Sequence, residues 1–174
     1  MKNHLFKISM VVLVVGFLGG AVLLKGDSPE RIRLGTEQAD NGREHVAQKE
    51  APEYGEATPP TSGNHGEPIP KGAYTQELPD YNTIHNLEHG YIYVSYSPAL
   101  PQEEIAKLKG LFFTPYSRED FSPTKVIMAP RTANEAPIVL SSWQREQTFE
   151  QFDEQKMIDY YMGNVNKSPE PTAS

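Results

Sequence analysis

The chain has 174 residues, a length typical of one domain of ordinary size. Its formal net charge of -7 and pI near 5.2 argue against a nucleic-acid partner, because neutralising phosphates requires a basic surface. Cysteine is absent, which excludes disulfides, thiolate metal sites, a cysteine nucleophile and lipid attachment through a lipobox cysteine.

An uncharged apolar segment, ISMVVLVVGFLGGAVLL, lies at residues 8–24 between Lys7 and Lys25. With the two apolar residues before Lys7 it covers roughly 20 residues, about the length that crosses the hydrocarbon core of a bilayer. No clean small-x-small cleavage site follows, which favours an uncleaved signal anchor at residues 1–25 over a removed signal peptide. Because only a few residues precede the span, we expect a single-pass cell-membrane protein with its C-terminal domain outside the cytoplasm.

The remainder of the chain divides by composition. Residues 26–40 are polar and are predicted to form a juxtamembrane stalk. The extracytoplasmic domain is predicted at 41–167, followed by a disordered tail at 168–174. Within the domain, segment 41–80 is so rich in Pro and Gly that long helices and central strands are excluded. Its scattered apolar residues favour a long ordered functional loop over a disordered connection.

Conventional secondary structure is predicted after this loop. Segments rich in β-branched and aromatic residues predict strands, at 91–96, 124–130 and 137–143. Apolar residues at helical spacing predict helices, at 97–113 and 147–163. The resulting βαββα order indicates an α+β fold, with a small mixed or antiparallel sheet and two packing helices.

Several strings occur in order along the chain. They are REHV around His45, YGEATPPTSGNHG ending in His65 and Gly66, HNLEHG from His85, LPQEEIAKLK, APIVLSSWQR and a terminal Pro-Glu. In this order they resemble a bacterial family known as domain of unknown function 3105. The resemblance covers residues 41–170, and PPTSG-x-H and HNLEHG are its low-probability strings. It implies a small protein with one N-terminal span followed by this domain, but no assigned activity, fold or cofactor.

Four of the five histidines lie in or beside those strings: His45, His65, His85 and His89. Neutral imidazole is the commonest metal ligand, and sulfur-free histidine sites suit zinc or copper. The His-x3-His spacing places His85 and His89 on one face of a helical turn, and the Gly/Pro loop can bring His65 to them. We predict a copper or zinc site formed by these three residues, with His45 as a candidate fourth ligand.

Two alternatives stay open. Histidine N–H groups could instead fasten the loop by bonding to its carbonyls, in a non-catalytic envelope scaffold that binds a protein partner. HNLEH also matches the inverted zinc-protease string, whose two histidines bind zinc while the glutamate acts as base. That mechanism needs a sustained helix, whereas Gly90 and a strand follow at once, and a third carboxylate ligand such as Glu150 or Glu154.

Glu88 has two interpretations of its own. It could accept an N–H from a liganding histidine and orient that ring, or it could cap the local turn. No second motif accompanies HNLEH, and no nucleophile elbow accompanies the serine before His65. The sequence therefore favours metal handling or sensing over catalysis.

Overall fold

The computed structural model describes residues 31–47, 50, 54, 57–114 and 121–172. A compact unit begins at Ile32 and contains every element discussed below. The predicted membrane span, residues 8–24, lies outside the described part of the chain. Among the helices that are described, none is both long and apolar enough to cross a bilayer.

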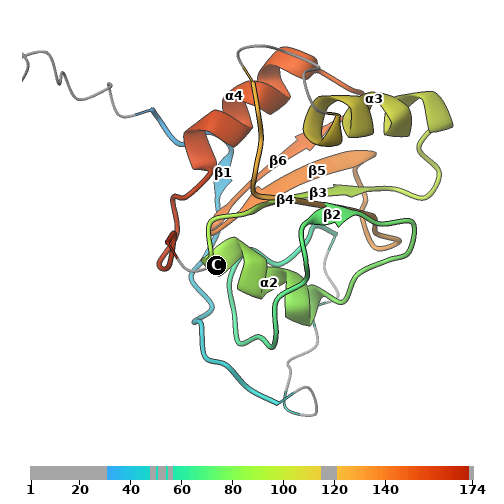
Figure 1. Ribbon diagram of the computed structural model, residues 1–174. Coiled ribbons are helices and arrows are strands. Elements are labelled where there is room, and N and C mark those ends of the chain that lie inside the picture. The colour runs from blue at the N-terminus through green and yellow to red at the C-terminus, as the bar shows by residue number, and fades with distance from the viewer. Residues whose placement is uncertain (1–30, 48–49, 51–53, 55–56, 115–120, 173–174) are drawn as a thin grey trace, which may run out of the picture. The chain divides into compact units, whose positions relative to one another are not determined.

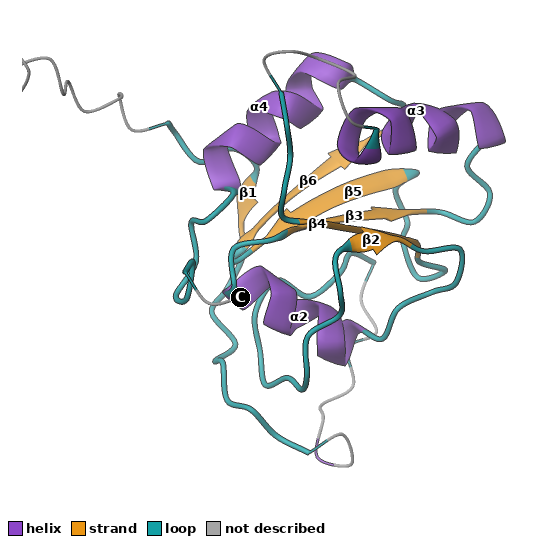
Figure 2. Cartoon of the chain, in the orientation of Figure 1, coloured by secondary structure: helices purple, strands orange, loops and turns teal. Residues whose placement is uncertain are grey.

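The described strands form one six-stranded mixed sheet in the order β1-β6-β5-β3-β4-β2. Their bounds are β1 Thr36–Glu37, β2 Gly72–Ala73, β3 Ile92–Tyr96, β4 Val126–Pro130, β5 Ile138–Ser142 and β6 Arg145–Phe149. Strand β3 runs parallel to β4 on one side and antiparallel to β5 on the other. The two short strands β1 and β2 close the edges of the sheet (Figure 2).

Helices cover both faces of this sheet. Those in the described part are α2 Asp80–Glu88, α3 Gln102–Phe113 and α4 Glu154–Asn164. Figure 1 shows α3 and α4 together on one face and α2 alone on the other. Successive side chains of β3 point to opposite faces of the sheet. Val94 is buried in the core cluster beneath α3 and α4, whereas Tyr93 packs with Ile84 and Leu87 of α2. The small layer around α2 therefore carries its own core.

The structure confirms the α+β class and the mixed sheet, and β3, α3, β4 and β5 lie within their predicted ranges. The predicted closing helix at 147–163 is wrong over its first residues, which belong to β6. Gln144 has φ 55 and turns the chain sharply after β5, so that Phe149 pairs with Ile138 across an antiparallel ladder. The helix begins only at Glu154, where the Asp153 carboxylate accepts the Lys156 N–H as an N-cap.

Helix α2 is a second difference, because the sequence predicts little more than one turn around HNLEH. The helix spans nine residues and begins at Asp80, so His85 to Glu88 form its last turn and His89 is its C-cap. The Asp80 carboxylate suits the positive end of the helix dipole and is bound by the buried Arg131 through Nε at 3.1 Å and Nη2 at 2.8 Å. The first turn is thus stabilised by a residue 51 positions downstream.

Both ends of the compact unit extend beyond the predicted domain limits. Strand β1 lies within the predicted stalk and pairs with β6, and the Arg33 guanidinium donates to the carbonyl of Trp143. At the other end, the Glu170 N–H donates to the Glu88 carbonyl at 3.1 Å and Lys125 Nζ donates to the Pro171 carbonyl at 2.7 Å. One backbone hydrogen bond and the Lys125 side chain therefore hold part of the predicted tail against the end of α2.

Candidate metal centre

The Gly/Pro loop brings two histidines next to each other before it reaches α2. His45 and His65 form an isolated parallel bridge, in which the Val46 N–H donates to the His65 carbonyl at 3.0 Å and the His65 N–H donates to the Glu44 carbonyl at 2.9 Å. The Tyr54 hydroxyl adds a bond to the Asn64 carbonyl at 2.6 Å. An irregular loop is thereby held by a strand-like pairing across 20 residues of sequence.

Side chains of α2 then fasten this loop to the helix. The Asn86 amide donates to the Ile69 carbonyl at 2.7 Å and accepts the Ile69 N–H at 2.9 Å. The Tyr81 hydroxyl donates to the Val46 carbonyl. His85 Nδ1 lies 2.5 Å from the Gly66 carbonyl. These bonds satisfy backbone groups, in the described part of the loop, that a segment without regular structure leaves unpaired.

Three of the predicted ligands converge here. His45, His65 and His85 each offer a ring nitrogen, and these atoms all lie within 4.8 Å of one another. The ring centroids are 4.7 Å apart for His45–His65, 4.8 Å for His45–His85 and 5.1 Å for His65–His85. The His65 side chain is fully buried, whereas that of His45 is 59% exposed. The group is therefore enclosed by the protein on one side and open to solvent on the His45 side.

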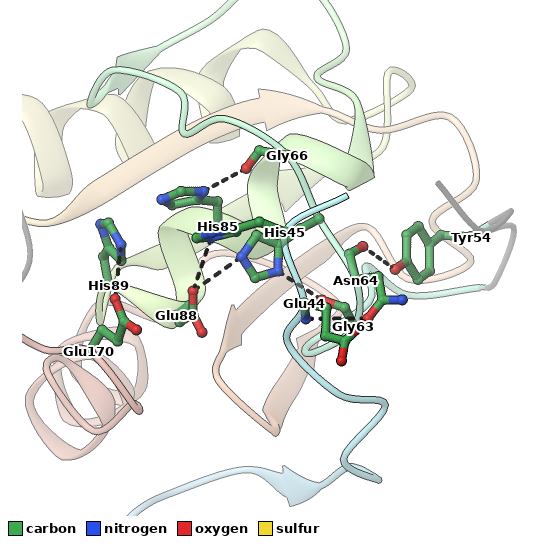
Figure 3. Close-up of polar contacts among 11 residues, drawn as sticks. Glu44, His45, Tyr54, Gly63, Asn64, Gly66, His85, Glu88, His89 and Glu170 are labelled. Atoms are coloured by element: carbon green, nitrogen blue, oxygen red, sulfur yellow. Dashed lines mark hydrogen bonds and ion pairs between the residues drawn. The ribbon is translucent and has the colours of Figure 1, made fainter. Parts of the chain in front are cut away.

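The buried carboxylate of Glu88 points into the same group (Figure 3). Its Oε2 lies 3.1 Å from His65 Nε2 and 3.6 Å from His45 Nε2. His65 Nδ1 lies 2.8 Å from the Gly63 carbonyl, and because a carbonyl only accepts, Nδ1 must carry the proton. A neutral His65 then turns the lone pair of Nε2 toward a carboxylate oxygen. A proton or another cation between these two acceptors is needed to make the contact favourable.

Burial disfavours the proton in that position. Desolvation lowers the pKa of His65 below its ordinary value of 6.5, and the neighbouring rings of His45 and His85 lower it further. The Gly63 carbonyl and the Glu88 carboxylate act in the opposite direction without outweighing burial. The neutral ring is thus favoured near pH 7, which leaves its Nε2 free to bind a metal.

This pKa shift predicts an acid sensitivity of the metal-free protein. With EDTA present, the free energy of unfolding should fall as the pH drops from about 7.5 to about 5.5, because the unfolded chain then takes up a proton that folded His65 does not. Urea unfolding at the two pH values measures the difference, and His65→Gln should show a smaller loss than the unsubstituted protein. Equal losses in both proteins would show that His65 does not cause the acid sensitivity.

His89 belongs to a second, adjacent group. With Glu88 and Glu170 it offers ligand atoms that lie within 4.8 Å of one another, and His89 Nε2 is 3.8 Å from Glu170 Oε2. The His85 and His89 rings stand on one face of α2 as predicted, with centroids 4.4 Å apart. Glu170 was not predicted, because nothing local in the sequence connects the terminal Pro-Glu to HNLEH.

The geometry differs from that of the inverted zinc-protease string. Helix α2 ends at Glu88, so His89 is its C-cap, and the two histidines fall into different groups. The carboxylate beside His89 is that of Glu170, and neither Glu150 nor Glu154 belongs to the groups found among the described residues. Glu88 Oε2 faces Nε2 of His65, the ring atom opposite the Nδ1 that lies 2.8 Å from the Gly63 carbonyl.

Comparison with known proteins decides the family. A family model described as "Protein of unknown function (DUF3105)" matches residues 45–174, about three quarters of the chain. The chain belongs to the DUF3105 family. No curated protein and no solved structure matches it. The DUF3105 match begins at His45 and extends past Glu170, so it contains every residue of both groups of candidate ligands.

Proposed function

We propose that this protein binds a copper or zinc ion through His45, His65 and His85, with Glu88 as the fourth ligand, and serves in metal handling or sensing. The observation that carries the proposal is the convergence of three imidazoles, whose ligand atoms lie within 4.8 Å of one another. The buried Glu88 carboxylate lies 3.1 Å from one of these atoms, His65 Nε2, and 3.6 Å from His45 Nε2. Three nitrogens and one oxygen are a ligand set that suits zinc in tetrahedral geometry and is also found with copper.

The hydrogen bonds around the rings support this assignment. In His65 and His85 the Nδ1–H donates to a backbone carbonyl, that of Gly63 or Gly66, and this fixes the tautomer with the Nε2 lone pair available. Histidine ligands of metals are generally oriented in this way by an acceptor at the other ring nitrogen. Such a site needs little rearrangement to accept an ion, because the rings are already held in place.

We further propose that the centre works outside the cytoplasm on a membrane anchor. Support comes from the uncharged segment 8–24, whose length suits a single span, and from the few residues that precede it. The cysteine-free composition is compatible with an oxidising compartment, where a histidine and carboxylate site does not depend on reduced thiols.

Metal uptake by the full-length protein tests the proposal. After incubation with Zn²⁺ or Cu²⁺ and removal of excess ion, elemental analysis should find bound metal that EDTA removes. At a free concentration of about 100 times Kd, binding stabilises the folded state by about 2.7 kcal/mol. For a unit of this size that corresponds to a rise in Tm of about 5–10 °C. His4→Ala removes the fifth histidine, which precedes the apolar segment 8–24, and is the matched control that should behave as the unsubstituted protein. Absence of uptake together with an unchanged Tm would contradict the proposal.

A second candidate function rests on the same hydrogen bonds. The bonds from His65 and His85 to the Gly63 and Gly66 carbonyls also fasten the loop, as they would in an envelope scaffold that acts through a protein partner. The two functions differ in the result of His65→Ala. A scaffold would lose stability in EDTA and show no metal dependence, whereas a metal protein would lose its metal-induced rise in Tm.

A further inference from the structure

The two groups of candidate ligands meet at one side chain. Glu88 Oε2 lies 3.1 Å from His65 Nε2 in the first group, and the Glu88 carboxylate also lies within 4.8 Å of the ligand atoms of His89 and Glu170. Figure 3 shows Glu88 between the ring of His45 on one side and the pair of His89 and Glu170 on the other. A carboxylate has two oxygens and can therefore bind two cations at once.

The C-terminal segment that supplies Glu170 is fixed to the helix end by its backbone. The Glu170 N–H donates to the Glu88 carbonyl at 3.1 Å. Lys125 Nζ donates both to the His89 carbonyl at 2.8 Å and to the Pro171 carbonyl at 2.7 Å, so it connects α2 to this segment. Glu170 thus reaches His89 through a defined set of main-chain contacts, even though its own side chain is 49% exposed.

We infer that the protein holds two metal ions, with the Glu88 carboxylate as the bridge between them; this inference rests on the proposed metal-binding function. The first ion is bound by His45, His65 and His85, and the second by His89 and Glu170. Carboxylate bridges of this kind join ions about 3.5–4 Å apart in two-metal proteins. The partly buried ring of His89, 12% exposed, and the buried Glu88 give the second ion a defined place at the C-terminal end of α2.

The two ions should differ in affinity. The first group is built from two buried imidazoles and one exposed one. In the described part of the chain, no lysine or arginine is among the hydrogen-bond and ion-pair partners of these rings. The second group has fewer imidazoles, an exposed carboxylate and the ammonium group of Lys125 close by, which repels a cation. The first ion therefore binds more tightly, and the second fills only at higher metal concentration.

The test is the stoichiometry of Zn²⁺ bound to the full-length protein in a titration followed by calorimetry and elemental analysis. We expect two ions per chain, the second more weakly bound. Glu170→Gln and His89→Ala should each reduce the number to one and leave the affinity for the first ion within about threefold. Glu150→Gln, which removes an exposed carboxylate elsewhere, is the matched control and should retain two. Because the Glu170 side chain is half exposed, its variant keeps the inference testable if His89→Ala fails to fold.

Cu²⁺ supplies an independent readout of the bridge. At two equivalents, electron paramagnetic resonance should show dipolar coupling between neighbouring ions, and the coupling should vanish in Glu170→Gln. One tightly bound ion in every variant, with no coupling at two equivalents, would overturn the second site and leave the proposed function intact. No bound ion in the unsubstituted protein would instead refute the proposed function itself.

Discussion

His65→Ala is expected to weaken Zn²⁺ binding at the first site by more than about 100-fold. The substitution removes a ligand whose Nε2 is already aimed at Glu88 Oε2 from 3.1 Å, and even loss of an outer hydrogen-bond partner of a metal ligand typically costs about 10–100-fold. Competition against a chromogenic chelator measures the affinity in the full-length protein. His65 is fully buried, so folding of the variant must be checked by circular dichroism.

Two further variants make this result specific. His45→Ala removes a ring that is 59% exposed, so it should lower the affinity with little effect on stability in EDTA. His4→Ala should leave both properties unchanged. If both variants fold and their Zn²⁺ affinity is unaltered, the three rings do not bind the metal ion.

Arg131→Met is expected to destabilise the protein by about 3–5 kcal/mol, the usual effect of breaking a buried ion pair by removing one partner. The Arg131 side chain is 2% exposed and binds both Asp80 oxygens, at 3.1 Å and 2.8 Å, while Nη1 donates to Asn134 at 3.2 Å. Without the guanidinium, the Asp80 carboxylate keeps its charge in a largely buried position at the start of α2. Urea unfolding monitored by Trp143 fluorescence measures the loss.

A double variant distinguishes the loss of the Asp80–Arg131 interaction from the cost of leaving the Asp80 carboxylate without a partner. Asp80→Asn combined with Arg131→Met should be more stable than Arg131→Met alone, because no uncompensated carboxylate remains. Lys156→Met is the matched surface control, since Lys156 is 68% exposed in its pair with Asp153 and should cost no more than about 1 kcal/mol. An effect of Arg131→Met as small as that of Lys156→Met would contradict the role given to this pair.

Local sequence patterns predict the central part of the fold well. The alternation in β3 and the helical spacing in α3 report residues that pack against immediate neighbours, so their signals are contained in a few positions. Strand β6 was not predicted, because Phe149 has helical spacing to later apolar residues. In the structure Phe149 pairs instead with Ile138 on β5. Strand β1, only two residues long, exists because β6 offers an edge to pair with.

The sequence by itself determined the chemistry available to this protein: an acidic, cysteine-free chain, an apolar segment suited to a membrane anchor, and four histidines placed in the strings of one family. Only the tertiary structure decided how these rings combine. It joined His45 to His65 and His85, placed the His89 ring beside His85 in an adjacent group with Glu88, and brought Glu170 to the far side of Glu88. Such a partition depends on backbone hydrogen bonds between segments far apart in the chain, which composition and spacing do not encode.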